Sequence, residues 1–186
     1  KIKIYTLGCK VNQYDSGKLA GELLQAGLKL TQKNADLAVV NSCAVTKTAI
    51  VKSGRMIKLA RKENPKAKIV LAGCWPKVEK IKNNIAGADL IMEGTDVIKF
   101  LATLKIKPAA NNNIKLADQS EHSRYFLKIQ DGCEQYCTYC IIPYTRGKLK
   151  SRQEAEVIAE IKQAVKAGYG EIVLSGIHLG LYGKEA

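Results

Sequence analysis

The sequence predicts an α/β protein built on a flavodoxin-like, doubly wound parallel sheet, with a smaller β-α-β unit after it. Short apolar runs alternate with segments of helical periodicity, and this alternation is typical of parallel sheets with right-handed crossovers. The runs 37–41 and 68–72 are almost continuously apolar, as expected for strands that are buried on both faces. In such sheets, ligands bind beyond the carboxyl ends of the strands.

The first strand is expected at 2–7, where β-branched and apolar side chains alternate. A helix is expected at 12–25, with Leu19, Leu23 and Leu24 on its buried face. Four more strands and three more helices complete this first unit. The strands are expected at 28–31, 37–41, 68–72 and 90–92, and the helices at 46–63, around Val78, Ile81 and Ile85, and at 96–104.

Residues 105–121 are polar and contain Pro108 and three consecutive asparagines. We expect them to link a first domain, 1–104, to a second domain, 122–186. The second domain begins with a strand at 124–130 and a turn at Asp131-Gly132. One β-α-β unit cannot bury its own faces as a barrel does, so this domain is expected to be truncated.

The second domain continues with a helix that starts at a capping box, in which Ser151 and Glu154 exchange hydrogen bonds with the first turn. A strand at 171–174 follows it. The apolar residues of this helix recur at helical spacing and are expected to be buried. They are Val157, Ile158, Ile161, Ala164 and Val165.

The chain is strongly basic, with 30 Lys and Arg against 17 Asp and Glu, a formal net charge of +13. This excess favours a polyanionic partner, nucleic acid before a membrane surface, although a merely lysine-rich soluble surface is the alternative. No apolar run is long enough to span a membrane, and no signal-peptide pattern is present. We therefore expect a cytoplasmic protein, where six cysteines are more often metal ligands than disulfides.

Three of the cysteines, Cys133, Cys137 and Cys140, form a C-x3-C-x2-C run between a strand and a helix. We call them the loop cysteines. Three thiolates in eight residues suit one soft metal centre, but a closed iron–sulfur or zinc site needs four ligands. One iron would then stay open to a small molecule. A zinc loop with a distant fourth ligand is the alternative, although no paired C-x2-C units support it.

The other three, Cys9, Cys43 and Cys74, each lie directly after a predicted strand. We call them the edge cysteines. The carboxyl ends of parallel strands meet at one edge of a sheet, so the fold is expected to gather these residues there. A second iron–sulfur cluster with three protein ligands is the sharper hypothesis, and three inert buried cysteines are the alternative.

These motifs resemble the radical S-adenosylmethionine (SAM) methylthiotransferases, which carry two clusters. The matching segments cover the whole chain, and the closest likeness is to the tRNA threonylcarbamoyladenosine methylthiotransferases. Relatives that act on isopentenyladenosine in tRNA or on a ribosomal protein remain alternatives. The segments that carry the likeness are TLGCKVNQYDS, VVNSCAVT, VLAGCWP and KIQDGCEQYCTYCIIPYTRG.

The resemblance implies two 4Fe–4S clusters, with the open iron of the loop-cysteine cluster binding SAM. A SAM-derived radical would attack carbon 2 of the modified adenine next to the anticodon, and the second cluster would present the sulfur. The second domain would be the start of a radical SAM (β/α) barrel. The implied partners are tRNA, through its anticodon stem-loop, and an electron donor such as flavodoxin or ferredoxin.

The same resemblance places Tyr139 near the SAM adenine, and Ser175 and Gly176 near the SAM amino group, although the usual glycine-glycine-glutamate is absent. Arg146 follows the loop cysteines and is a candidate for phosphate or the SAM carboxylate, with an ordinary surface arginine as the alternative. His178 is more often structural than catalytic in such a position.

The helix at 46–63 and the residues after it carry eight basic side chains and one acidic one between 46 and 69. Because this segment begins three residues after Cys43, we expect contact with tRNA phosphates. Two other function classes remain open. They are a non-catalytic iron–sulfur electron carrier, which SAM cleavage would exclude, and a zinc-containing nucleic-acid-binding module, which metal analysis would exclude.

Overall fold

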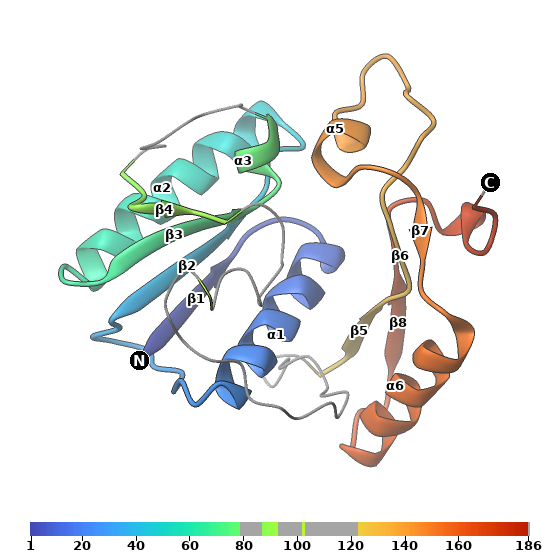
Figure 1. Cartoon of the computed structure of the whole chain (residues 1–186), viewed down its shortest axis with the longest axis horizontal. Coiled ribbons are helices and arrows are strands. Elements are labelled where there is room, and N and C mark those ends of the chain that lie inside the picture. Colours follow the sequence, from blue (N-terminus) through green and yellow to red (C-terminus); the bar gives the residue numbers. More distant parts are fainter. Residues whose placement is uncertain (79–86, 93–101, 103–122, 186) are drawn as a thin grey trace.

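The computed structural model describes residues 1–78, 87–92, 102 and 123–185 (Figure 1). Its first part is a four-stranded parallel sheet in the order β1-β2-β3-β4. The linker 105–121, residues Ile81 and Ile85, and all of the expected helix at 96–104 except residue 102 lie outside the described residues. The elements of this part are β1 (Ile2–Thr6), α1 (Lys10–Gln25), β2 (Leu37–Ser42), α2 (Lys47–Glu63), β3 (Lys68–Gly73), α3 (Trp75–Val78) and β4 (Leu90–Ile91).

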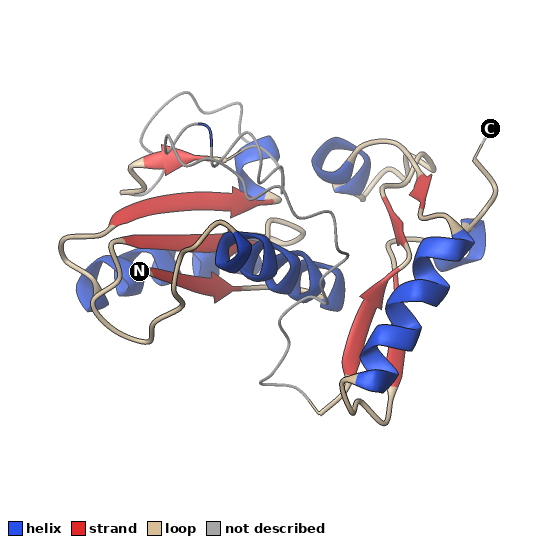
Figure 2. Ribbon diagram, turned by 60° about the horizontal axis from the view of Figure 1, so that its bottom comes forward, coloured by secondary structure: helices blue, strands red, loops and turns tan. Residues whose placement is uncertain are grey.

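The helices α1 and α2 cover opposite faces of this sheet (Figure 2). On one face, Leu19 and Leu23 of α1 pack against Val39 of β2. On the other face, Ile57 and Ala60 of α2 pack against Ala38, Val40 and Ile69, among others. All six residues of β2 are buried, as expected for a central strand covered on both faces. The doubly wound sheet is confirmed.

The strand expected at 28–31 is wrong as a strand, because the structure has only a single bridge there, between Leu30 and Ile2. Ile2 also pairs with Leu37, so Leu30 lies on the outer side of β1. The chain thus crosses from one side of β1 to the other. The switch point of a flavodoxin-like sheet therefore lies between β1 and β2. Cys9 and Cys43 follow the two strands that flank it.

Helix α1 begins at Lys10, two residues before its expected start, with Cys9 as its N-cap. Leu24 is 38% exposed, so its expected place on the buried face is wrong. Helix α2 begins as expected, because the Thr46 hydroxyl accepts a hydrogen bond from the Ala49 amide. Its last residue is followed by Asn64-Pro65, where a helix cannot readily continue.

The second part pairs β5 with β8 in parallel and β6 with β7 antiparallel. The mean plane of β5 and β8 stands apart from the first sheet, with α6 on its outer side (Figures 1 and 2). A short 3-10 helix, Leu179–Leu181, follows β8. The remaining elements are β5 (Tyr125–Lys128), β6 (Gln130–Asp131), α5 (Ile142–Arg146), β7 (Lys150–Ser151), α6 (Glu154–Lys166) and β8 (Ile172–Ser175).

The capping box predicted for α6 is wrong. The N-cap is Gln153, whose side chain makes no capping hydrogen bond, and Ser151 belongs to β7. The Ser151 hydroxyl instead accepts a hydrogen bond from the Gly183 amide at 2.9 Å. Pairing with β6 therefore determines the conformation at Ser151.

The buried stripe of α6 is narrower than its apolar residues suggested. Val157 and Ala164 are buried, whereas Ile158 and Val165 are 43% and 59% exposed. Glu160, which is 1% exposed, takes their place on the buried face. It lies three residues after Val157 and four before Ala164, which is one face of a helix.

The two parts meet along α1. Tyr14 of α1 belongs to the same core cluster as Tyr125, Leu127 and Ile129 of the second part. Helix α1 therefore lies between its own sheet and β5, as the views in Figures 1 and 2 both show. No helix among the described residues is both long enough and apolar enough to cross a bilayer.

Candidate cofactor and metal site

The edge cysteines follow β1, β2 and β3 at the carboxyl edge of the sheet, as the sequence predicted. Cys9 is exposed, while Cys43 and Cys74 are 8% and 4% exposed. Three thiols thus lie at the edge where parallel sheets bind their ligands, and two of them are shielded from water.

Backbone contacts hold these three loops close together. Gly8 has φ of +103°, and a Cβ placed on it would lie 3.1 Å from the Cys43 Sγ atom. The Cys74 amide donates to the Ser42 carbonyl at 3.1 Å, which ties the third loop to the second. Since Gly8 accepts both the positive φ and the contact with Cys43, a larger residue there would push the first two loops apart.

The loop cysteines lie in a turn that is closed at its ends by backbone hydrogen bonds. The Cys133 amide donates to the Gly147 carbonyl at 3.0 Å, and the Cys140 amide donates to the Cys137 carbonyl at 2.9 Å. Gly132, with φ of +70°, precedes the turn, and a Cβ there would lie 1.8 Å from the Lys148 carbonyl oxygen. Only glycine therefore fits at the entrance of this loop.

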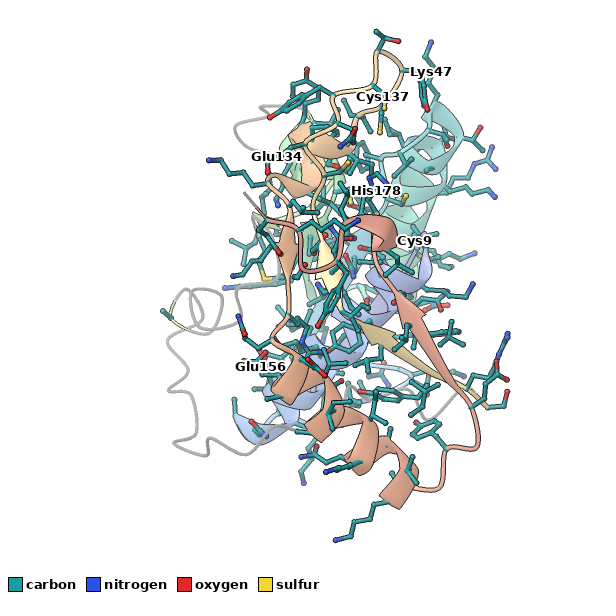
Figure 3. The ribbon with its side chains drawn as sticks, turned by 90° about the vertical axis from the view of Figure 1, so that its right-hand side faces the viewer. Cys9, Lys47, Glu134, Cys137, Glu156 and His178 are labelled. Atoms are coloured by element: carbon teal, nitrogen blue, oxygen red, sulfur yellow. The ribbon has the colours of Figure 1, made fainter. Side chains whose placement is uncertain are left out.

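The six thiols are all free, and no three ligand side chains among the described residues stand close enough together to hold a metal ion as placed. The donor chemistry nevertheless fits iron–sulfur clusters, because each set supplies three cysteine sulfurs from one loop or one sheet edge. The Cys133 Sγ atom also lies 3.9 Å from Nδ1 of His178. In Figure 3, Cys9, Cys137 and His178 lie in the upper half of the molecule, away from Glu156 on α6.

The other predicted cofactor residues surround the same loop. Tyr139 is 91% exposed and is therefore available to a ligand. Ser175 is buried, and its hydroxyl donates to the Leu127 carbonyl at 3.2 Å, so this hydroxyl links β8 to β5. Gly176 packs closely, since a Cβ there would lie 2.7 Å from Leu179 and 2.9 Å from Gln130. These three residues remain predictions.

Gln130 is a residue of this site that the sequence did not single out. Its side chain is buried, and its Oε1 atom accepts hydrogen bonds from the amides of Ile177 and His178, both at 2.8 Å. Its Nε2 atom donates to the carbonyls of Asp131 and Gly132. Gln130 thus ties the segment after β8 to the entrance of the cysteine loop.

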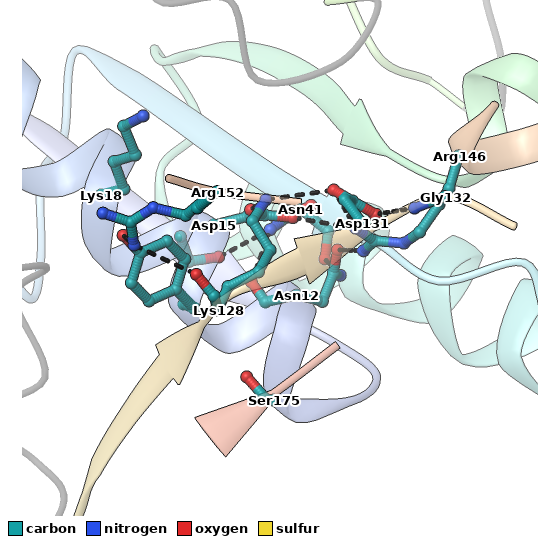
Figure 4. A network of polar contacts seen from close by, with 12 residues as sticks. Asn12, Asp15, Lys18, Asn41, Lys128, Asp131, Gly132, Arg146, Arg152 and Ser175 are labelled. Atoms are coloured by element: carbon teal, nitrogen blue, oxygen red, sulfur yellow. Dashed lines mark hydrogen bonds and ion pairs between the residues drawn. The ribbon is translucent and has the colours of Figure 1, made fainter. Parts of the chain in front are cut away.

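A largely buried network of charges joins the two parts (Figure 4). Arg146 pairs with Asp15 at 3.2 Å and with Asp131 at 3.0 Å, and Lys128 pairs with the same two carboxylates. Arg146 also donates to the Asn12 side chain at 3.1 Å. Asp15 and Asn12 belong to α1, so the residue that ends α5 is anchored on the helix that Cys9 caps.

This geometry fits neither an ordinary surface arginine nor an arginine that binds phosphate or the SAM carboxylate. The side chain of Arg146 is only 7% exposed, and its hydrogen bonds go to protein groups. The pKa of Arg146 is raised, although burial alone lowers it, because Asp131, Asp15 and Cys74 favour its charged form. Burial raises the pKa of the Cys74 thiol, and the positive charge of Arg146 opposes the rise.

A second buried network adjoins the first. Glu160 accepts hydrogen bonds from Tyr14 at 3.1 Å and from Tyr125 at 2.6 Å, and it pairs with Arg152 at 2.7 Å. Burial and the Glu160 charge raise the pKa of Tyr14, so its hydroxyl stays protonated. The two networks together fix α1 to the second part.

The basic face expected on α2 is present. Lys47, Lys52, Arg55, Lys58 and Lys62 are exposed or nearly so, whereas Arg61 pairs with Asp89 at 2.6 Å. In Figure 3, Lys47 at the start of α2 lies at the same end of the molecule as Cys137.

Comparison with known families divides the chain in two. Residues 1–93 match the family described as uncharacterized protein family UPF0004, and residues 127–185 match the radical SAM superfamily. The first match covers the parallel sheet with the edge cysteines, and the second begins in β5 and includes the loop cysteines.

The curated relatives are tRNA-modifying enzymes by name. The threonylcarbamoyladenosine tRNA methylthiotransferases of Bacillus subtilis and Thermotoga maritima are 35% and 36% identical, over 99% of this chain and 45% of each relative. The tRNA-2-methylthio-N(6)-dimethylallyladenosine synthase of a Thermoanaerobacter species is 34% identical, over 98% of this chain and 43% of the relative. The chain thus spans about half the length of the curated relatives it matches.

A solved structure shares the fold. It is the radical SAM methyltransferase TsrM from Kitasatospora setae, described with cobalamin and a [4Fe-4S] cluster bound. The TM-score is 0.59 at 12% identity, over 97% of this chain and 49% of that chain. At this identity, the likeness supports the arrangement of the elements alone.

Proposed function

This chain belongs to the radical SAM methylthiotransferase family, and we propose that it acts in adding a methylthio group to tRNA. One observation carries the proposal. A C-x3-C-x2-C loop and three strand-end cysteines lie on two parts that are joined by buried charges through one helix. An electron carrier would be expected to complete four protein ligands for each cluster, and neither set does so.

We propose the division into a first domain at 1–104, a linker at 105–121 and a radical SAM domain from 122. The limits of the two family matches, 93 and 127, support a boundary in this region. The residues between 103 and 122 lie outside the described part of the chain.

The loop cysteines would hold one 4Fe–4S cluster and the edge cysteines a second. With SAM bound, the first cluster would supply the electron that yields methionine and a 5′-deoxyadenosyl radical. The protein's own part is to place and shield these groups. Gln130 holds residues 176–178 against the loop, and Gly176 leaves no room for a side chain there. Tyr139 is exposed for stacking on the SAM adenine.

The proposed substrate is N6-threonylcarbamoyladenosine next to the anticodon, with sulfur and methyl added at carbon 2. The motifs Gly8 to Gln13 and Cys43 to Thr46 favour this nucleoside. Relatives named for dimethylallyladenosine match almost as well as those named for threonylcarbamoyladenosine, so that nucleoside is the second candidate. We further propose cytoplasmic tRNA and a flavodoxin or ferredoxin electron donor as partners.

The exposed lysines and Arg55 of α2 are proposed to contact tRNA phosphates. They lie on the helix that begins four residues after Cys43, and no carboxylate precedes Glu63 in that helix. Phosphate contacts of this kind position RNA without reading its sequence.

The test is nucleoside mass spectrometry of tRNA from a strain that lacks the gene. We expect loss of 2-methylthio-N6-threonylcarbamoyladenosine, its return with the wild-type gene, and no return when the loop cysteines are replaced by Ala. Loss of the isopentenyl-type methylthio nucleoside instead would support the second candidate. An unchanged tRNA nucleoside profile would contradict the proposal.

A further inference from the structure

Arg146 is the residue through which the two cysteine sets come together. It ends α5, six residues after Cys140, yet its guanidinium lies against the first part. Nη1 donates to Asp15 at 3.2 Å and to Asp131 at 3.0 and 3.1 Å, and Nη2 donates to Asn12 at 3.1 Å (Figure 4). A planar guanidinium that meets partners on both parts fixes their relative orientation as well as their distance.

Arg146 also lies close to the loops that carry the edge cysteines. Helices α3 and α5 are in contact, Cys74 directly precedes α3, and Arg146 ends α5. Asn12, which accepts a hydrogen bond from Arg146, donates in turn to the carbonyls of Leu7 and Ser42, which precede Cys9 and Cys43. Arg146 therefore comes from the loop-cysteine part and is connected to the loops of the edge cysteines.

The charges around Arg146 balance. Arg146 and Lys128 are positive, and Asp15 and Asp131 are negative, so this group of four is neutral. Arg146 and Asp15 are 7% and 5% exposed, and water and salt screen such charges poorly. Loss of Arg146 alone would therefore leave a net negative charge in this group.

We propose that Arg146 is a positioning residue for the edge-cysteine site: the loop-cysteine part supplies it, its positive charge lies at the edge of the sheet that carries the edge cysteines, and its hydrogen bonds hold the two sites at a fixed separation. This inference rests on the proposed function in one respect, namely that the edge cysteines hold a cluster. One-electron reduction of a cluster adds negative charge to it, so a fixed cation beside it raises its midpoint potential.

The proposal has an electrostatic half, the effect of the Arg146 charge on the edge-cysteine cluster, and a positional half, the fixed separation of the two sites. The electrostatic half is tested in protein whose loop cysteines are all replaced by Ala, so that a single cluster remains. Its midpoint potential is measured by anaerobic titration with dithionite, followed by electron paramagnetic resonance. Arg146→Gln should shift the potential to more negative values. Arg146→Lys, which keeps the charge but not the planar fork, should shift it less.

Arg152→Gln is the matched control, because Arg152 also joins the two parts through Tyr14 and Glu160 and its contacts do not include Cys74. It should leave the potential unchanged. An equal shift in Arg152→Gln would attribute the effect to a loosened junction and overturn the electrostatic half. An unchanged potential in Arg146→Gln, at full cluster content, would overturn it as well.

The positional half is tested without any cluster, by hydrogen–deuterium exchange on the metal-free protein. The amides of Cys133 and Gly147 are bonded within the loop that Arg146 anchors, and both should exchange faster in Arg146→Gln. Unchanged exchange there would overturn this half. If the Ala background with intact edge cysteines binds no iron, the proposed function and the electrostatic half fail, while the exchange result still decides the positional half.

Discussion

Tyr14→Phe should measure how firmly the two parts are joined. The Tyr14 hydroxyl on α1 donates to the Glu160 carboxylate on α6 at 3.1 Å, and both residues are buried. It also accepts a hydrogen bond from Arg152 at 3.0 Å. The substitution removes one oxygen atom and leaves the ring in the core cluster, so packing is nearly unchanged.

The expected cost is about 2 kcal/mol in the free energy of unfolding, since a hydrogen bond to a charged group contributes about 1.5–3 kcal/mol. The bond from Arg152 adds little to this, because Arg152 keeps its ion pair with Glu160 at 2.7 Å. For a chain of this size, a loss of about 2 kcal/mol lowers the midpoint of thermal unfolding by roughly 4–8 °C.

The assay is urea unfolding of the metal-free protein, followed by circular dichroism. Tyr144→Phe is the control, because Tyr144 is 65% exposed and its loss of a hydroxyl should cost less than about 0.5 kcal/mol. A double-mutant cycle with Glu160→Gln should show coupling between the two positions. Equal stability of Tyr14→Phe and Tyr144→Phe would refute the argument that the buried hydrogen bond from Tyr14 to Glu160 stabilises the junction.

Three further predictions concern the sites and the sheet. Replacing all three edge cysteines by Ala should still allow SAM to yield 5′-deoxyadenosine but give no methylthio product, and a folded variant that makes this product would refute the assignment. Gly132→Ala should abolish iron binding by the loop cysteines, because its Cβ would meet the Lys148 carbonyl, whereas Gly147→Ala, at φ of +75° but with open space, should retain most of the iron. The pKa of Asp89 is lowered because, although burial raises it, the Ile69 amide and Arg61 favour the carboxylate. Its contribution to stability is therefore present above the ordinary Asp pKa and lost as pH falls, and Asp89→Asn should flatten the acid side of the stability–pH curve.

The strands could be predicted because their signal is local. A short apolar run such as 37–41 has few alternatives to a buried strand, and Asn64-Pro65 ends α2 wherever the chain goes next. Once the strands were predicted, the edge cysteines could be placed as well, because the carboxyl ends of parallel strands share one edge of the sheet.

The polar junction could not be predicted from local signals. Asp15 and Arg146 are 131 residues apart, and whether a charged side chain is buried depends on the partner that the fold brings to it. Glu160 is the instructive case. Its spacing from Val157 and Ala164 places it on the buried face, but its charge suggests the solvent side, and only the partners Tyr14, Tyr125 and Arg152 reconcile the two.

The position of α1 gives these contacts a common consequence. Its first residue follows Cys9, one side of it packs on its own sheet through Leu19 and Leu23, and another side packs on β5 through Tyr14. Strand β5 leads through Asp131-Gly132 into Cys133. A rotation of one part against the other would therefore have to break the buried pairs of Asp15 and Glu160 together. For the proposed reaction, which must bring a radical and a sulfur atom to the same carbon, a helix shared by both sites gives a fixed separation without a mobile carrier between them.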